Sequence, residues 1–180
     1  HIDVVVEEHD EFAARFARPT IAGSDEAVVR VDDLHMHVLP LLGALTRAAI
    51  AEFVEDAQAL GMKVIIDWVA NHTGCDHHWT IDHPDYYKKD ENGDFFDAHG
   101  WDDVIDLDYS NPHLRKAMIQ SMRHWLGESG IDGFRCDMAM LTPPDFWMEA
   151  RQGLEQDRQL FWLAELDPLD NPEYMQVFDA

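Results

Sequence analysis

The stretch that decides the fold runs from Ile131 to Ala139 and reads Ile-Asp-Gly-Phe-Arg-Cys-Asp-Met-Ala. Its apolar residues predict a strand that carries Arg135 and Asp137 near its carboxyl end. Side chains alternate between the two faces of a strand, so these two are expected to point the same way. A guanidinium beside a carboxylate favours its ionised form, which suits a nucleophile, although such pairs are more often structural ion pairs.

The residues on both sides of this stretch alternate between helix and strand patterns. Apolar residues at helical spacing predict helices over residues 46–60, with Thr46 as the N-cap and Gly61 as the stop, 111–127 and 142–156. Nearly continuous apolar runs predict buried strands over residues 62–69 and 160–166, and residues 175–178 are expected to begin a further strand. This order predicts right-handed βαβ units and a parallel sheet.

Two segments fall outside this alternation. Residues 1–44 form an N-terminal segment that the pattern does not place, with strand candidates over Ile2–Val6 and Ala27–Val31 and a helix candidate over Glu11–Ala17. Residues 73–110 are rich in Asp, His, Gly and aromatic residues, and Asn92-Gly93 marks a tight turn. A connection of that length is typical of a functional loop or a small subdomain.

The composition limits the kinds of partner. The 180 residues carry a net charge of −23 at pH 7, which argues against nucleic acid or an anionic membrane as a partner. No apolar run approaches the ~20 residues of a membrane span. A soluble protein is therefore expected. Cys75 and Cys136 form no disulfide framework, so the compartment stays open between secreted, periplasmic and cytoplasmic.

Polar residues follow three successive predicted strands. They are the segment Asp67–His72, Arg135 with Asp137, and Glu165. In parallel α/β folds, and in barrels above all, the carboxyl edge of the sheet carries the active site. No glycine-rich phosphate loop follows any of these strands, so a nucleotide site is not expected.

A pair of carboxylates on neighbouring strand ends suits glycoside hydrolysis. Arg135 is expected to keep Asp137 ionised for attack on the anomeric carbon. Glu165 follows the apolar residues 161–163, and partial desolvation there would raise its pKa and hold the proton that the leaving oxygen needs. Acidic strand ends also bind metal ions, so the residues alone leave a metal site open as the alternative.

Four blocks of the sequence resemble the α-amylase family of retaining glycoside hydrolases, glycoside hydrolase family 13. In chain order they are Asp67-Trp-Val-Ala-Asn-His72, Val104-Ile-Asp-Leu-Asp108, Gly133-Phe-Arg-Cys-Asp137 and Ala164-Glu165. The resemblance covers residues 45–180 and implies a partial (β/α)8 barrel, about its third to sixth strands. Residues 73–110 then resemble the loop-rich subdomain inserted after the third barrel strand.

The resemblance also implies a role for individual residues. Asp137 would be the nucleophile and Glu165 the general acid/base, while Arg135 would orient Asp137. His72 would hydrogen-bond the sugar in the cleaved subsite, and Asp67 would support the first block or face the same pocket. The family's third catalytic carboxylate lies in a His-Asp pair after a later strand, and no such pair follows Glu165 in this sequence.

The sequence also contains candidate residues for a metal ion and for aromatic contacts with a sugar. Asn71 and Asp106 match positions that bind a structural calcium ion in many members of the family, although other members lack the ion. Trp79 and Trp101 offer rings that could stack on sugars, with packing as the alternative for at least one of them. No organic cofactor is expected.

The expected function is therefore that of a retaining α-glycoside hydrolase acting on α-glucans such as starch and maltooligosaccharides. One alternative is a truncated, non-catalytic fragment or a piece that only binds glucan. Another is a transglycosylase or isomerase of the same family. A partial barrel exposes sheet edges and apolar faces, so self-association is a further expectation.

Overall fold

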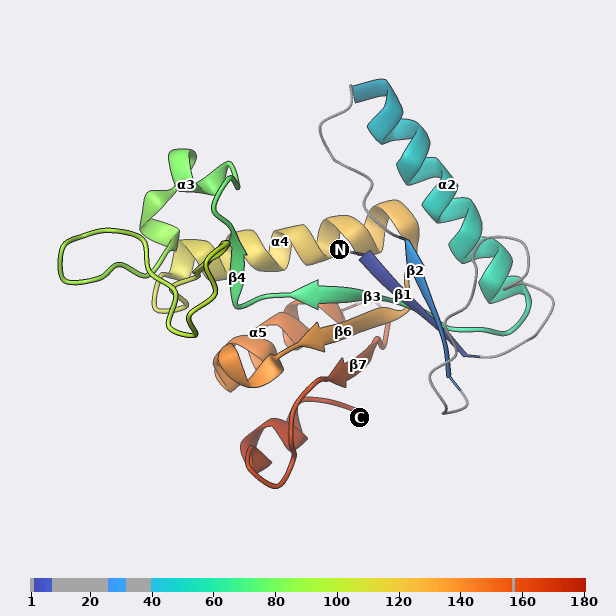
Figure 1. The fold of residues 1–180 in the computed structure, drawn as a ribbon. Coiled ribbons are helices and arrows are strands. Elements are labelled where there is room, and N and C mark those ends of the chain that lie inside the picture. Colours follow the sequence, from blue (N-terminus) through green and yellow to red (C-terminus); the bar gives the residue numbers. More distant parts are fainter. Residues whose placement is uncertain (1, 8–25, 32–39, 157) are drawn as a thin grey trace. The chain divides into compact units, whose positions relative to one another are not determined.

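The computed structural model describes residues 2–7, 26–31, 40–156 and 158–180 (Figure 1). The helix candidate Glu11–Ala17 lies outside these residues. The chain divides into two compact units, His1–Trp68 with Arg123–Arg135 and Val69–Met122 with Cys136–Ala180. The predicted boundary between residues 44 and 45 stays a prediction.

The first unit begins with two strands in the N-terminal segment, as the apolar runs predicted. Strand β1 (Ile2–Glu7) pairs antiparallel with β2 (Glu26–Val31) and, on its other side, antiparallel with β3 (Val64–Val69). Neighbouring strands of a (β/α)8 barrel are parallel. The β1–β2 pair is therefore an addition to the barrel-like part rather than one of its strands.

Helix α2 (Pro40–Ala59) starts earlier than its apolar pattern suggested. Thr46 lies inside the helix, so the N-cap predicted there is wrong; Pro40 is the first helical residue, where its fixed φ suits a helix start. The predicted stop is confirmed, because Gly61 has a φ of +85° and its N–H donates to the carbonyl of Gln58 at 3.0 Å. Val54 and Ala57 are buried on this helix.

Strand β6 (Gly133–Asp137) lies beside β3 in the sheet of the first unit. Helix α4 (Pro112–Ser129) precedes it and ends before Gly130, whose φ is +71°, while Gly127 lies inside the helix. Asp132 joins the two strands at their start, since its N–H donates to the Val64 carbonyl at 2.6 Å and its Oδ2 accepts the Val64 N–H at 3.0 Å.

The second unit contains the long connection, in which only short elements form. Strands β4 (His72–Gly74) and β5 (Val104–Asp106) make an antiparallel pair with His72 opposite Asp106. Between them lie α3 (Trp79–Asp82), the 3-10 helix η1 (Pro84–Tyr86) and a hairpin turn closed by a bridge between Lys89 and Phe95. The turn predicted at Asn92-Gly93 is confirmed, with Gly93 at a φ of +88°.

The second unit continues through η2 (Ala139–Leu141), α5 (Pro144–Leu154), β7 (Phe161–Ala164) and η3 (Pro172–Gln176). The strand expected over residues 175–178 is wrong, because η3 occupies its first half. The chain returns to β7 just afterwards: Asp179 N–H donates to the Trp162 carbonyl at 2.8 Å, and Ala164 N–H donates to the Ala180 carbonyl at 2.9 Å. The fully buried side chains of this part include Phe146, Trp147 and Trp162.

Candidate active site

The two carboxylates predicted to catalyse stand at the ends of two adjacent strands, and both residues belong to the second unit. Asp137 is the last residue of β6, and Glu165 directly follows β7. The Glu165 N–H donates to the Cys136 carbonyl at 3.0 Å, and the Ala139 N–H donates to the Glu165 carbonyl at 3.1 Å. The backbone around both carboxylates is thus fixed by direct hydrogen bonds.

Met138, which follows Asp137, has a left-handed backbone conformation with φ 44° and ψ 48°. It is the sole residue other than glycine with a positive φ in the part of the chain that the structure describes. Left-handed geometry costs an L-residue with a side chain about 1–2 kcal/mol. Such strained residues cluster at functional sites, where the surrounding structure enforces them. The Met138 N–H points to Glu165 Oε2 at 3.4 Å.

The two carboxylates differ in exposure. Asp137 is half-buried, whereas Glu165 is exposed. The predicted desolvation of Glu165 by residues 161–163 is therefore wrong in this structure. Glu165 lies beyond the last residue of β7, and Phe161, one of the apolar residues expected to cover it, is itself 41% exposed.

Arg135 makes an ion pair in the first unit. Its Nη1 donates to both carboxylate oxygens of Asp67, at 2.8 and 2.7 Å, and Asp67 is on β3 beside β6. Asp67 is a partner of Arg135 that the sequence pattern did not indicate. It comes within reach because adjacent strands lie only about 4.8 Å apart. The orienting role of Arg135 toward Asp137 stays a prediction.

His72 lies in a half-buried position and is held by its neighbour. The Asn71 amide nitrogen lies 2.8 Å from His72 Nδ1. Burial lowers the pKa of His72, while the negative charges of Asp137 and Asp106, in that order, act against the shift. The ring also meets the Trp101 ring edge-on, with centroids 5.5 Å apart. His72 thus contacts the Trp101 ring and feels the negative charge of Asp137.

Asn71 and Asp106, the candidate calcium ligands, are both buried, at 4% and 1% exposure. Leu107 N–H donates to the Asn71 carbonyl at 3.0 Å, which holds the two positions next to each other. Each has one buried Oδ1 without a hydrogen-bond partner, and Asp106 Oδ2 accepts from Lys88 Nζ at 3.0 Å. Unsatisfied buried oxygens are costly, and carboxylate and amide oxygens are what Ca²⁺ prefers. The donor set therefore fits such an ion.

The described residues contain no group of three or more His, Cys, Asp or Glu side chains placed to hold a metal ion. A calcium ion at Asn71 and Asp106 would thus need backbone or water oxygens for its remaining positions. The adjacent rings of His77 and His78, 4.4 Å apart, do not extend to such a group.

The two tryptophans considered for sugar stacking differ in their surroundings. Trp79 is half-buried and packs edge-on against Tyr86, with centroids 5.3 Å apart. Trp101 is 36% exposed. Its backbone N–H and that of His99 both donate to Asp97, a residue that none of the sequence motifs includes. The signal was local: an Asp shortly before a glycine in a loop commonly accepts backbone N–H groups.

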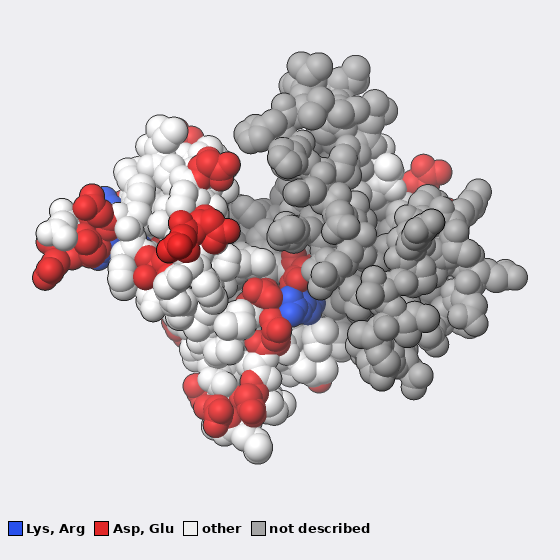
Figure 2. Space-filling model, in the orientation of Figure 1, with Lys and Arg blue, Asp and Glu red and all other residues white. Residues whose placement is uncertain are grey.

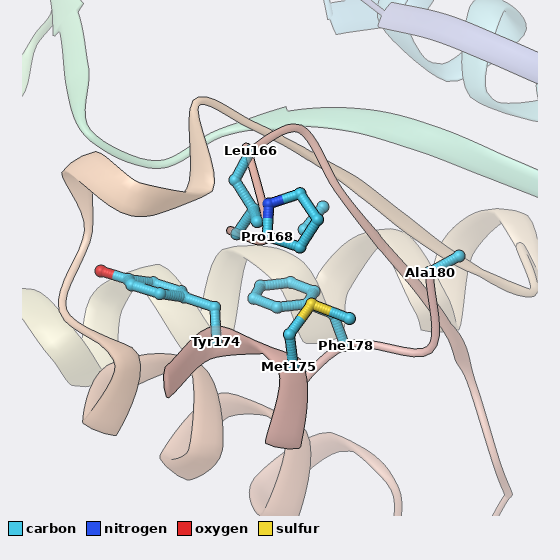
Figure 3. A pocket seen from close by; sticks show the side chains of 7 residues that line it. Leu166, Pro168, Tyr174, Met175, Phe178 and Ala180 are labelled. Carbon is cyan, nitrogen blue, oxygen red and sulfur yellow. The ribbon is translucent and has the colours of Figure 1, made fainter. Parts of the chain in front are cut away.

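A small apolar cavity of about 70 Å³ lies beside the end of β7 (Figure 3). Its walls include Leu166, Pro168, Met175 and Phe178. The hydroxyl of Tyr174, another wall residue, donates away from it to the Met140 and Thr142 carbonyls at 3.1 and 2.9 Å. A cavity without free polar groups is unsuited to a sugar, so it does not compete with the carboxylate edge as the site.

Acidic side chains dominate over basic ones on the described part of the face in Figure 2. Helices α2, α3, α4 and α5, within the described ranges, include none that is long and apolar enough to cross a membrane.

Strands β3, β6 and β7 are parallel, helices α4 and α5 connect them in βαβ order, and polar side chains follow the strands. These features define a fold of the α/β-barrel type, the class in which the carboxyl edge of the sheet carries the active site. The chain belongs to the α-amylase family, since the family model of the alpha amylase catalytic domain matches residues 36–105 and 99–176.

Solved structures agree with this assignment. A maltogenic α-amylase from Thermotoga neapolitana is similar with a TM-score of 0.68 and 41% identity, over 74% of this chain and 31% of that one. An α-amylase from Geobacillus thermoleovorans, solved with acarbose, is similar with a TM-score of 0.60 and 29% identity, over 74% of this chain and 33% of that one. The predicted partial (β/α)8 barrel is confirmed.

Curated relatives point to the same family. The α-amylase MalA of Haloarcula japonica is 26% identical over 132 residues, which are 68% of this chain and 20% of that protein. Trehalose-6-phosphate hydrolase of Bacillus subtilis is 33% identical over 125 residues, 51% of this chain and 22% of that protein. The chain spans about a fifth of the length of these relatives and about a third of the solved structures.

Proposed function

We propose that this chain carries the nucleophile and the general acid/base of a retaining α-glycoside hydrolase that acts on α-glucans. The observation that carries the proposal is the placement of Asp137 and Glu165 at adjacent strand ends, joined through the Cys136–Glu165 and Ala139–Glu165 backbone hydrogen bonds. The family membership supports the substrate class, because relatives bear the names α-amylase and oligo-1,6-glucosidase.

The reaction is a double displacement. The carboxylic acid of Glu165 gives its proton to the glycosidic oxygen, while the carboxylate of Asp137 attacks the anomeric carbon. The bond to the leaving sugar breaks and a β-glycosyl ester to Asp137 forms. Glu165, now a carboxylate, takes a proton from water, and the resulting attack on the anomeric carbon releases Asp137 and a sugar with retained configuration.

Two further side chains support these steps. His72 has a lowered pKa, which favours the neutral ring that can hydrogen-bond a sugar hydroxyl without adding a charge. Arg135, fixed by both oxygens of Asp67, gives β6 a permanent positive charge two residues before Asp137. A cation in that region favours the ionised carboxylate that attack requires.

We further propose that Asn71 and Asp106 hold a structural calcium ion. Their two buried Oδ1 atoms without hydrogen-bond partners support the proposal. The ion would share the buried charge of Asp106 with Lys88 and tie Asn71, which directly precedes β4, to β5. It takes no part in the displacement itself.

The test of the catalytic proposal is turnover of soluble starch and maltooligosaccharides by the purified chain and by Asp137→Asn and Glu165→Gln variants, with Asp102→Asn as an exposed matched control. A fluoroglycoside with a good leaving group supplies the second readout by mass spectrometry. Its leaving group departs without protonation, so Glu165→Gln should still acquire the glycosyl mass and Asp137→Asn should not. Labelling that persists in Asp137→Asn would refute the assignment of the nucleophile.

The second candidate function is a non-catalytic glucan-binding piece. It is favoured by the exposed ring of Trp101 beside His72, which can contact a sugar without any bond being broken. Maltoheptaose binding without turnover or mass labelling would support it. A transglycosylase or isomerase activity is separable by product analysis, and relatives named trehalose synthase/amylase make trehalose the product to look for.

A further inference from the structure

A short loop between the two strands of the β4–β5 pair is organised around one carboxylate. Asp97 Oδ2 accepts the backbone N–H of His99 at 3.0 Å and that of Trp101 at 2.7 Å. Gly100 lies between these two donors with a φ of +79°, a backbone conformation that residues with a side chain rarely adopt. The loop backbone therefore curves around the Asp97 carboxylate, which accepts two of its N–H groups.

Both ends of this loop are fixed to the strand pair. On one side, the carbonyl of Phe96, next to Asp97, accepts the Asp106 N–H at 3.0 Å. On the other side, the carbonyl of Asp103 accepts the Cys75 N–H at 3.3 Å. Residues 97–102 lie between these two hydrogen-bonded positions. That is the part which the Asp97 carboxylate organises.

The organised loop presents two rings side by side. The centroids of His99 and Trp101 are 4.9 Å apart at an interplanar angle of 35°. Trp101 meets His72 edge-on at 5.5 Å, and the charge of Asp137 acts on His72. Trp101 nevertheless stays 36% exposed. An exposed ring beside the site offers an apolar face to the C–H groups of a sugar.

The charge state of Asp97 suits this task. Burial raises the pKa of Asp97, but the N–H groups of Trp101, His99 and Gly100 and the charge of His99 outweigh that effect, and the net pKa is lowered. A carboxylate that accepts several backbone N–H groups is a strong acceptor in its ionised form.

We propose that Asp97 is a positioning residue that sets the His99–Trp101 ring pair against His72 as one wall of the glucan-binding subsite. The inference rests on the proposed function for its ligand, a chain of neutral α-linked glucose units. Asp97 itself touches no sugar in this arrangement. It acts through the loop backbone and through Trp101.

The experiment compares Asp97→Ala, Asp97→Asn and Asp102→Ala in the full chain. Asp102 is exposed in the same segment, so its variant removes the same charge without removing the acceptor of the His99 and Trp101 backbone N–H groups. Acrylamide quenching of Trp101, taken as the difference from a Trp101→Phe chain in each background, reports the position of the ring. Titration with maltoheptaose reports the subsite.

Asp97→Ala should increase the quenching of Trp101 and weaken maltoheptaose binding about three- to tenfold, in line with the loss of an aromatic contact. Asp97→Asn keeps a carbonyl oxygen for the same N–H groups and should restore most of both readouts. Asp102→Ala should change neither. The melting temperature of each variant identifies chains that fail to fold.

Equal Trp101 quenching in Asp97→Ala and Asp102→Ala would overturn the positioning role, even if the melting temperature of Asp97→Ala fell. Changed quenching with unchanged maltoheptaose affinity would overturn the subsite role. A chain that binds no maltoheptaose in any form, and shows no turnover, would count against the proposed function. The quenching difference would then still decide whether Asp97 holds Trp101.

Discussion

One nitrogen of Arg135, Nη1, donates to both carboxylate oxygens of Asp67, at 2.8 and 2.7 Å. The side chain of Asp67 is 8% exposed and that of Arg135 23% exposed. Removing one member of a buried pair leaves an uncompensated charge, which costs about 3–5 kcal/mol when burial is complete. The partial exposure of Arg135 reduces this penalty.

Asp67→Asn should therefore lower the free energy of unfolding by about 1–3 kcal/mol in urea titrations. The double variant with Arg135→Gln should recover part of the loss, as expected for residues that interact directly. Asp145→Asn is the control, because its ion pair with Arg115 is largely exposed on the Asp side and should be worth less than about 1 kcal/mol. A strictly additive double variant would show that the pair does not act as a unit.

Asp132 predicts how stability depends on pH. Burial acts to raise its pKa, but hydrogen bonds from Lys63, the Val64 N–H and Gln58 lower it overall. A folded-state pKa below the unfolded value of about 3.9 means a contribution that is complete above that value. The contribution is lost as the pH falls through the lower folded-state pKa.

Asp132→Asn should thus cost about 1–3 kcal/mol near neutral pH. The difference from the unmodified chain should shrink as the pH falls below about 4. Urea unfolding between pH 7 and pH 3 measures this. Lys63→Met should reproduce a smaller part of the same pH dependence. A difference that stays constant over the whole range would contradict the assignment to Asp132.

The calcium proposal predicts a metal-dependent melting temperature. At a concentration a hundred times its dissociation constant, a bound ion adds about 2.7 kcal/mol to stability. Added Ca²⁺ should raise the melting temperature and chelation should lower it. Asp106→Asn and Asn71→Ala should abolish the response. Mg²⁺, which demands a stricter geometry, should substitute poorly. A melting temperature that changes neither when Ca²⁺ is added nor after chelation would refute the site.

The left-handed conformation of Met138 predicts an unusual order of stability among its variants. Met138→Ala and Met138→Gly both remove the half-buried side chain, but only glycine adopts φ 44° without strain. The glycine variant should be more stable than the alanine variant by about 1 kcal/mol, the reverse of the usual order in regular structure. Equal unfolding free energies for the two variants would argue against strain at this position.

The sequence predicted the parts of this molecule that repeat a simple period. The apolar runs of β3, β6 and β7 and the apolar faces of α2 and α4 indicated parallel strands joined by helices. Asp137 and Glu165 followed from their positions at strand ends. These features depend on local spacing, which a single sequence contains.

Features that depend on partners distant along the chain were missed. Arg135 has an ion pair with Asp67, 68 positions away, because the two residues lie on the neighbouring strands β6 and β3. The exposure of Glu165 depends on how far β7 extends, and the strain at Met138 on the hydrogen bonds around it. None of these leaves a periodic signal in the sequence.

The Asn71–His72 contact has a consequence for the tautomer of the imidazole. An amide nitrogen only donates, so Nδ1 of His72 is the acceptor at 2.8 Å, and the neutral ring carries its hydrogen on Nε2. In the proposed site, a sugar hydroxyl facing Nε2 would then accept from His72. The same amide has its Oδ1 buried and without a hydrogen-bond partner. A cation bound to that oxygen would prevent the amide from turning over, so the metal would select which imidazole nitrogen carries the proton.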